Sequence, residues 1–520
     1  MKKLLVILIV LALALPAFAQ VTFRITNGSE PASVDPHLIS GVPEHRVYLA
    51  LFEGLTIPDP SGKAVGGAAE SWSVSADNMT WTFKLRKGNV WSDGVPITAT
   101  TVVKSWLRCL NPDTAAEYAS IIKDIIKGAK EYNEGTGKPE DVAIKAVDDF
   151  TFQFKTIAPA PYVLSMLIHY GFAIVPIHVI EKWGKEWVLP EHFVSNGAYV
   201  LKEWKPNDRL VVVKNPKYWD AKNVKVDQVI YYPSDNLATT YAMYINGEAD
   251  WNANSPPPDK VIEAKKRSDY IRVAEFGSYY YEFNIQKPPF NDVRVRKAFS
   301  MAVDRNELVE KVTMSGEMPA TGFTPPTEGF TPTKGIGEDV EQAKKLLADA
   351  GYPGGKNFPK VTILYNTSAR HKSIAEYFQQ RWEQNLGVKV ELFNQEFATY
   401  LQTRKDGKMG GFDLARAGWI ADYADPNTFL FMFLSNNEDF NDPRWNNPKY
   451  DELVRKANAM QPGAERMKVF QDAEKLLIDQ DHVVMPIYWY VTQNFIDLKK
   501  WGGWATNSLD QHALKFIYKK

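Results

Sequence analysis

The segment from Lys360 to Leu392 constrains the fold more than any other part of the chain, because it predicts two parallel strands joined by a helix. Residues 360–366 alternate apolar and polar side chains as a strand does, residues 368–387 repeat apolar positions at helical spacing and end at a glycine, and residues 388–392 alternate again. A strand-helix-strand unit of this kind builds a parallel sheet covered by helices. We therefore expect an α/β protein.

Three other segments have clear patterns. Residues 291–312 predict a helix that restarts at Asp304, where Glu307 completes a capping-box pattern. Residues 339–353 predict a second helix that ends at a glycine and a proline, and residues 81–99 predict a β-hairpin. Single cores rarely exceed roughly 250–300 residues. A chain of 520 residues with 45% hydrophobic content is therefore expected to form two or three domains.

Residues 1–19 have the three parts of a secretory signal. Two lysines precede an apolar stretch from Leu4 to Leu15, and Ala17-Phe18-Ala19 has the small-x-small arrangement that signal peptidase cuts. A membrane anchor needs about 20 apolar residues, so we expect cleavage and a periplasmic protein. The single cysteine, Cys109, is far from this signal and offers neither a lipid-attachment site nor a disulfide.

Charge and motifs exclude several functions and leave one open. The net charge is −1, no basic tail is present, and nucleic acid is therefore not an expected partner. The sequence contains no zinc-protease, nucleophile-elbow, phosphate-loop or EF-hand motif, and its eight histidines are scattered, so we expect no metal and no cofactor. A glycosidase needs only two carboxylates about 5–10 Å apart, which the spacing of 62 acidic residues does not exclude.

Aromatic residues are numerous, with 15 Trp, 24 Tyr and 27 Phe. They include the runs 279–281 (YYY) and 488–490 (YWY). Most aromatic side chains pack in cores or between domains. The excess also suits a cleft that encloses a ligand.

Residues 416–426 (RAGWIADYADP) carry two opposite charges at even spacing. A strand over 412–422 would place Arg416 and Asp422 on one face, roughly 20 Å apart at ~3.3 Å per residue. Charges this far apart do not pair with each other, but they suit the two termini of an extended peptide of about three to five residues. Asp425, before Pro426, is most simply interpreted as a helix N-cap.

Five stretches in this order give a family resemblance: residues 69–99, 195–204, 279–299, 316–326 and 416–430. Together they make the chain, from about Phe23 to its end, resemble the periplasmic oligopeptide-binding receptors of ABC-type permeases. The resemblance implies a periplasmic-binding-protein type II fold with two lobes that close on a cleft. It also implies a receptor, not an enzyme, which engulfs short peptides of about 2–5 residues as a monomer and delivers them to an inner-membrane ABC permease.

The resemblance implies three domains after the signal peptide (1–19). Domain I is discontinuous and comprises 20–52, 177–276 and 490–520; domain II comprises 53–176 and domain III 277–489.

Specific residues follow from the same resemblance. Asp422 and Tyr118 match positions that hold the ligand ammonium group, and Arg416, Arg404 and His371 match positions that meet its carboxylate. Without the resemblance, Arg404 would be interpreted as a solvated charge. Further contacts are implied for seven other residues, namely Ser40, Val42, Tyr280, Phe397, Gly418, Trp419 and Ile420.

Three positions depart from the family pattern. Ser40 stands in place of a glutamate, Thr313 in place of a lysine, and Phe397 in place of a tryptophan that packs on ligand side chains. An acid and a base are thus missing at the carboxylate end. A modified peptide, such as a murein peptide, or another small ligand is therefore the alternative. A secreted hydrolase and a structural envelope protein are the competing function classes.

Overall fold

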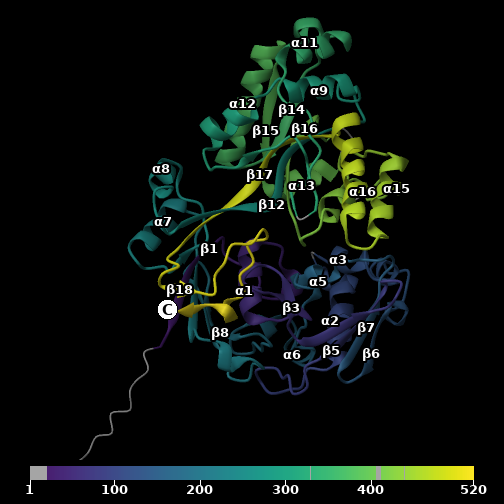
Figure 1. Ribbon diagram of the computed structural model, residues 1–520. Helices are drawn as coiled ribbons and strands as arrows, with labels where there is room; N and C mark the ends of the chain where they lie inside the picture. The colour runs from purple at the N-terminus through teal and green to yellow at the C-terminus, as the bar shows by residue number, and fades with distance from the viewer. Residues whose placement is uncertain (1–19, 117, 328, 406–410, 438–439) are drawn as a thin grey trace, which may run out of the picture.

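The computed structural model describes residues 20–520 except 117, 328, 406–410 and 438–439; the expected signal peptide lies outside them. Two long antiparallel strands, β12 (Tyr270–Phe283) and β17 (Val484–Ile496), join two lobes (Figure 1). We name residues 20–276 and 490–520 lobe 1, and residues 277–489 lobe 2. The largest buried apolar cluster lies almost wholly in lobe 1 and the next two almost wholly in lobe 2, so each lobe has its own core.

One mixed sheet runs through both lobes, in the order β15-β14-β16-β12-β17-β11-β1-β10-β9-β8, with β13 beside β17. Lobe 2 contributes β13 (Met318–Pro319), β14 (Val361–Asn366), β15 (Val390–Gln395) and β16 (Leu414–Ile420). Lobe 1 contributes β1 (Thr22–Gly28), β8 (Tyr199–Lys205), β9 (Arg209–Lys214), β10 (Gln228–Pro233) and β11 (Trp251–Asn252). The pairing of β12 with β17 shifts register between Ala274 and Ser278, where the two strands pass from one lobe to the other.

Lobe 1 also holds a separate antiparallel sheet in the order β4-β5-β7-β6. Its strands are β4 (Ala69–Val74), β5 (Thr80–Leu85), β6 (Ile144–Asp148) and β7 (Thr151–Lys155). The strands β2 (Thr56–Pro58) and β3 (Ala64–Gly66), which precede β4 in the chain, form a separate two-stranded sheet. These strands fall in the segment expected to form domain II. Because one continuous core spans this sheet and the rest of lobe 1, the domain boundaries stay a prediction.

The helices of lobe 1 are mostly short. They are α1 (Val42–Leu51), α2 (Ala99–Leu110), α3 (Ser120–Lys123), α4 (Ala129–Asn133), α5 (Val163–Met166), α6 (Ile177–Trp183), α7 (Leu237–Ile245) and α8 (Val261–Ala264). Lobe 2 contains α9 (Val293–Met301), α10 (Arg305–Glu307), α11 (Val340–Asp349), α12 (Ala369–Leu386), α13 (Phe397–Lys405), α14 (Asn427–Leu430), α15 (Pro448–Asn458) and α16 (Ala464–Lys475). No helix in the described part of the chain has both the length and the apolar character needed to cross a bilayer.

The predicted strand-helix-strand unit is confirmed. Strands β14 and β15 are parallel neighbours, and α12 connects them. Ile374, Phe378 and Trp382 form the buried face of this helix, which ends where Gly387 takes a left-handed conformation at φ +70°. The restart at Asp304 is also confirmed, because its side chain accepts hydrogen bonds from two N–H groups of the next turn.

The predicted hairpin over residues 81–99 is wrong. Strand β5 pairs with β4 and β7 instead of with the residues that follow it. Phe83 of β5 stacks on Phe154 of β7, with ring centroids 5.9 Å apart, so apolar burial selects partners that are distant in sequence. Around the turn at Gly94 an isolated bridge joins Val90 and Pro96, and the N–H groups of Trp91 and Ile97 donate to the carbonyls of Val95 and Asn89. This short pairing does not lengthen into a pair of strands, and proline has no N–H with which to extend a ladder.

Candidate functional site

Strand β16 positions the two charges that the sequence singled out. It lies antiparallel to β12, with Arg416 opposite Tyr281, Gly418 opposite Tyr279 and Ile420 opposite Gly277. Because directly opposed residues share a face, Arg416, Gly418 and Ile420 face the same side. The strand ends at Ile420, so the expected strand over 412–422 is too long. Asp422 lies in the bend that follows it.

One edge of β16 is open. Its second neighbour, β14, pairs only with Leu414 and Ala415. The N–H of Ala421 donates to Phe276 of β12, so the alternation of an antiparallel ladder turns the N–H and C=O groups of Gly418 and Ile420 away from β12. These groups have no backbone partner among the described residues.

Asp422 lies between the lobes without a strong cation beside it. The only basic group within 4.0 Å in the described part of the chain is His169 of lobe 1, whose Nε2 lies 3.9 Å from Oδ1 of Asp422. Burial, with a smaller contribution from His45, holds the pKa of His169 well below its usual value, so this ring is neutral. Burial raises the pKa of Asp422 itself to about 7.

Aromatic rings of lobe 1 surround this carboxylate. The ring of Tyr118 lies 4.6 Å from that of His169 and 5.2 Å from that of Tyr170. Burial raises the pKa of Tyr170 above its usual value, and Tyr118 and Asp422 add to this effect. The structure therefore brings Tyr118 and Asp422 near each other, as the family resemblance implies, although they belong to different lobes.

The two lobes touch next to Asp422. Tyr423 stacks on Tyr162 of lobe 1, with ring centroids 4.8 Å apart, and Nδ2 of Asn427 lies 3.3 Å from the Tyr162 hydroxyl. Asp425 accepts the N–H of Asn427 at 3.0 Å, but α14 begins at Asn427 with Pro426 at the N-cap position, so the expected N-cap was placed one residue too early. Asp425 also forms a buried bidentate ion pair with Arg466, at 2.6 and 2.9 Å, which the sequence did not predict.

Arg416 provides a buried positive charge without an acidic partner. Its guanidinium donates to the hydroxyl of Tyr490 at 3.1 Å and to Oδ1 of Asn366 at 3.3 Å, and it lies 4.8 Å from the ring centroid of Tyr279. The titratable groups that favour its charge among the described residues are tyrosines and not carboxylates, and its Nε is buried without a hydrogen-bond partner there. A Cβ on Gly418 would lie 2.5 Å from the Tyr490 hydroxyl and 3.0 Å from an Arg416 nitrogen, so this approach requires glycine.

His371 lies beside Arg416, as expected. Its Nδ1 is 3.2 Å from the hydroxyl of Tyr279. Burial, then Arg416 and Arg370, lower the pKa of His371 to about 3, so the ring is neutral and offers a hydrogen bond without charge.

Arg404 does not join this group. Its guanidinium pairs with Glu282 at 2.7 Å and Asp442 at 2.8 Å, and its side chain is 11% exposed, so it is not a solvated charge. Glu282 follows Tyr281 in β12, so its side chain lies on the other face of the sheet from Tyr281 and Arg416. Two carboxylates already balance Arg404, and the structure does not support its expected role with a ligand carboxylate.

Two further expected residues direct their rings away from Arg416. Tyr280 is 1% exposed and packs on Phe323, with ring centroids 4.9 Å apart, so its ring is core and not ligand surface. Trp419 lies on the same face of the sheet as Tyr280 and packs on Phe431 and Phe440. Its ring is therefore directed toward the core of lobe 2, although its backbone belongs to β16.

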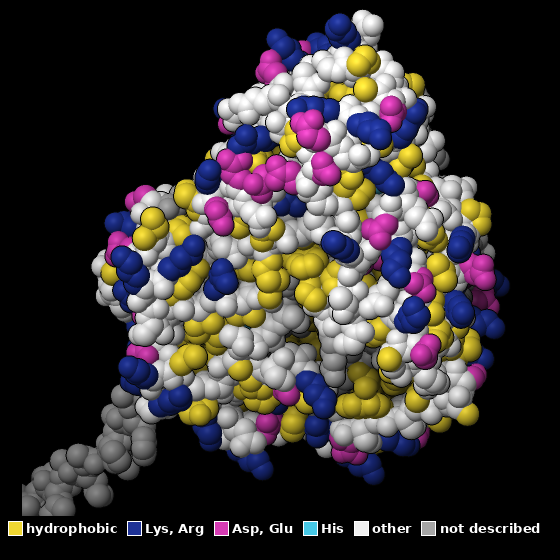
Figure 2. All heavy atoms as spheres, turned by 45° about the horizontal axis from the view of Figure 1, so that its top comes forward, with side chains coloured by type: hydrophobic (Ala, Val, Ile, Leu, Met, Phe, Trp, Pro, Cys, Tyr) yellow, Lys and Arg dark blue, Asp and Glu magenta, His cyan; other side chains and the backbone are white. Residues whose placement is uncertain are grey.

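The remaining expected residues are exposed. Ile420, Val42 and Phe397 are 40%, 44% and 56% exposed, and Ser40 is also exposed. Figure 2 shows the molecule hollowed between its two parts, with hydrophobic side chains around the hollow. Three residues that sequence reasoning missed lie around the two charges: His169, Tyr490 and Arg370. The tyrosine lies in an aromatic run that the sequence did mark, whereas the other two carry no distinguishing pattern.

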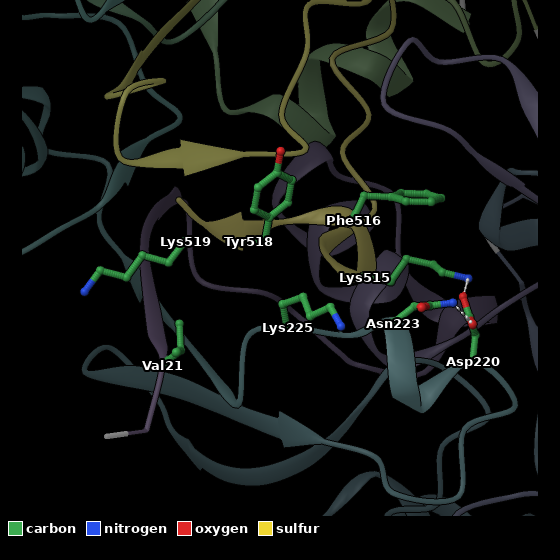
Figure 3. A pocket seen from close by; sticks show the side chains of 8 residues that line it. All are labelled: Val21, Asp220, Asn223, Lys225, Lys515, Phe516, Tyr518 and Lys519. Carbon is green, nitrogen blue, oxygen red and sulfur yellow. Dashed lines mark hydrogen bonds and ion pairs between the residues drawn. The ribbon is translucent and has the colours of Figure 1, made fainter. Parts of the chain in front are cut away.

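A second cavity, of about 650 Å³, lies elsewhere in lobe 1 (Figure 3). Its buried charge, Lys515, lies 3.2 Å from Asp220 and 3.8 Å from Glu53. Because these acids already balance the lysine, the cavity lacks the unpaired charges of the cleft. Within the described residues, no group of three or more His, Cys, Asp or Glu could hold a metal ion.

Comparison with known proteins gives consistent matches. Residues 63–441 match the model of the bacterial extracellular solute-binding proteins, family 5 Middle. The chain is 41% identical over 504 residues to the periplasmic oligopeptide-binding protein OppA of Escherichia coli strain K12, covering 95% of this chain and 91% of the relative. It is 38% identical over 482 residues to the periplasmic murein peptide-binding protein MppA of the same strain, covering 91% and 88%. The crystal structure of Haemophilus influenzae OppA in complex with RPPGFSPFR has a TM-score of 0.83 and 35% identity, over 96% of this chain and 99% of that chain.

Proposed function

The chain belongs to family 5 of the bacterial extracellular solute-binding proteins, and from this premise we propose that it binds short peptides and delivers them to an ABC-type importer. The relatives named for oligopeptide binding support this ligand class. The expected signal peptide supports a periplasmic location in particular. We further propose that the receptor acts as a monomer, without catalysis and without nucleic acid.

One observation carries the proposal. A partly buried carboxylate without a strong cation, Asp422, and a partly buried guanidinium without a carboxylate, Arg416, lie six residues apart along one strand and its bend. Buried charges are ordinarily paired, so each favours a partner from outside the chain. A peptide in extended conformation carries an ammonium group at one end and a carboxylate at the other, which matches both sites.

The open edge of β16 supplies what lies between these charges. An extended peptide can add to a free strand edge by main-chain hydrogen bonds that do not depend on its sequence. Gly418 and Ile420 direct their backbone groups to that edge, and the exposed side chain of Ile420 adds an apolar contact. We therefore expect affinity to come mainly from the backbone and termini, and side-chain selectivity to be low.

Closure of the lobes is part of the mechanism. Asp422 belongs to lobe 2, while His169 and Tyr118 belong to lobe 1, so an ammonium group at Asp422 contacts both lobes. A ligand of this kind shifts the open-closed equilibrium by its differential affinity for the closed state.

The test uses protein freed of ligand by unfolding and refolding. A mixed tripeptide pool should lower its radius of gyration in X-ray scattering and raise its Tm, because binding to the native state alone stabilises it, by about 2.7 kcal/mol at a hundredfold excess over Kd. The pool must be recovered intact. Peptides returned cleaved would reject the receptor in favour of a secreted hydrolase, and no response to any peptide would leave the modified-ligand alternative or a structural role.

A modified peptide is the second candidate. The similarity to a murein peptide-binding protein favours it, as do Ser40 and Thr313, which offer neither the acid nor the base expected from the family resemblance. Native mass spectrometry of protein purified without denaturation would distinguish an ordinary peptide from a modified one by the mass of the retained ligand.

A further inference from the structure

Arg370, at the N-terminal end of α12, is held in place by lobe 2 while part of it stays accessible. One of its terminal nitrogens donates to Oε1 of Glu317 at 2.5 Å and also to the hydroxyl of Ser315. The Glu317 side chain is 2% exposed, whereas that of Arg370 is 41% exposed. Thr313 donates to the other oxygen of Glu317 at 2.8 Å. The acid is thus fixed and buried, and it orients an arginine whose remaining donors are not committed to it.

The fixed acid lies beside the residue that holds Arg416. Strand β13 pairs with β17 so that Met318 is opposite Trp489. Continuing this antiparallel register by one residue places Glu317 opposite Tyr490. The hydroxyl of Tyr490 accepts the hydrogen bond from Arg416 at 3.1 Å. Arg370 and Arg416 therefore approach the same tyrosine from different elements, one from a helix and one from β16.

A shared set of neighbours supports this convergence. Tyr279, Tyr488 and Tyr490 all lie near both arginines. His371, next to Arg370 in the helix, is influenced by both guanidinium groups and lies 3.2 Å from the Tyr279 hydroxyl.

Charge balance defines what this group would bind. Arg370 is balanced by Glu317, His371 is neutral, and Arg416 has no acidic partner among the described residues. The group thus carries one net positive charge but two guanidinium groups, each able to present several N–H donors. Such a group fits one carboxylate with two oxygens. Arg404, already held between two acids, does not provide this.

We infer that Arg370 is the second guanidinium that contacts the ligand carboxylate together with Arg416, and that Glu317 and Ser315 position it. This inference rests on the proposed peptide-binding function. Two arginines at one place fix where the carboxylate binds relative to Asp422. We therefore expect a free C-terminal carboxylate to strengthen binding relative to a blocked end.

Calorimetry with one tripeptide as the free acid and as the C-terminal amide tests this. Arg370→Leu should weaken binding of the free acid about tenfold or more, as expected for the loss of a charge-assisted hydrogen bond, and should leave binding of the amide unchanged. Arg370→Lys should restore part of the loss. Arg381→Leu is the matched control, because Arg381 lies on the same helix but pairs with Glu307, and it should affect neither peptide. Equal effects of Arg370→Leu on acid and amide would overturn the inference and indicate a purely structural ion pair.

A measurement without peptide provides a second criterion. Because Arg370 contributes to the lowered pKa of His371, Arg370→Leu should raise that pKa in an NMR titration, whereas Arg381→Leu should not. An unchanged His371 pKa would overturn the convergence of the two arginines. If wild-type protein bound no peptide, the proposed function and this inference would fail together. If wild-type and Arg416→Leu proteins behaved as expected and Arg370→Leu bound both peptides normally, this inference alone would fail.

Discussion

The two ends of the cleft hold opposite charges in very different ways. At one end Asp422 lies at the contact between the lobes, among aromatic rings and a neutral histidine of the other lobe. At the other end Arg416 donates hydrogen bonds to Asn366 of lobe 2 and to Tyr490, which lies on the connecting strand β17 where lobe 1 begins. The first environment depends on contact between separate parts of the two lobes, whereas the second is built on lobe 2 and the strand that joins the lobes.

The difference also concerns charge state. Arginine keeps its proton at any pH at which the protein is folded, so the cationic end is permanently charged. Burial raises the pKa of Asp422 to about 7, so the anionic end gains or loses its charge near neutral pH. Under the proposed function, the cationic end is preformed, while the anionic end couples ammonium binding to lobe closure and to proton release.

The largest expected effect comes from removing the charge at Asp422. Asp422→Asn should weaken binding of peptides with a free amino terminus by about 3–5 kcal/mol, because the ammonium would then be buried without a counter-charge. N-acetylated versions of the same peptides should lose little, and they serve as the control in calorimetry. Equal losses for both sets would show that Asp422 does not bind the ammonium group.

The second prediction separates two arginines that the sequence grouped together. Arg416→Leu should weaken free-acid peptides by about 2–3 kcal/mol relative to amides, since it removes charge-assisted hydrogen bonds. Arg404→Leu should instead lower the free energy of unfolding by about 3–5 kcal/mol, because Glu282 and Asp442 would lose their buried cation. Denaturant unfolding and calorimetry on both variants distinguish these outcomes. If both variants lost affinity for the free acid more than for the amide, and by similar amounts, Arg404 would also contact the ligand carboxylate.

The third prediction is a pH dependence that originates at one end only. In the closed arrangement Asp422 is protonated below pH 7 and must release this proton to pair with an ammonium group, so affinity should fall by up to about tenfold per pH unit as pH decreases from 7. Calorimetry in buffers of different ionisation enthalpy should detect proton release near pH 6. N-acetylated peptides should lack this dependence, and a dependence common to both peptide types would place the titrating group elsewhere.

The same carboxyl group has the opposite effect on stability. Its folded-state pKa is raised, so between about pH 4 and 7 the unfolded chain binds fewer protons than the folded one, and stability falls as pH rises through that window. Asp422→Asn should remove this slope from the ligand-free protein and make it more stable at pH 8, by on the order of 1–3 kcal/mol. The difference in Tm between wild type and variant, measured from pH 4 to 8, tests the sign.

Sequence reasoning located the elements that have local patterns. The βαβ unit, the end of α12 at Gly387 and the cap at Asp304 depend on periodicity and on a few residues with specific backbone roles, and each was found. The hairpin was mispredicted because β5 obtains its partners by packing Phe83 on Phe154, about seventy residues away.

The site shows the same limit. Asp422 and Arg416 could be singled out because their opposite charges and even spacing are visible in the sequence. Tyr280 and Arg404 could not be judged, because burial of a tyrosine against Phe323 and pairing of an arginine with Asp442 are tertiary events. Arg370 stands in no recognisable sequence pattern. Its proposed role is visible only in the fold, where β13 places its partner Glu317 beside Tyr490.

The smallest expected effect concerns the contact that closes the anionic end. Tyr162 of lobe 1 stacks on Tyr423 of lobe 2 beside Asp422, and such aromatic pairs contribute about 0.5–1.5 kcal/mol. Tyr162→Leu should therefore shift the ligand-free protein toward the open state, which raises its radius of gyration in X-ray scattering and weakens peptides by up to about tenfold. Tyr162→Phe is the matched control, because it keeps the ring and removes only the hydroxyl near Asn427. If closure depended on the cationic end instead, both variants would scatter and bind as wild type does, and the division between a preformed end and a closing end would be wrong.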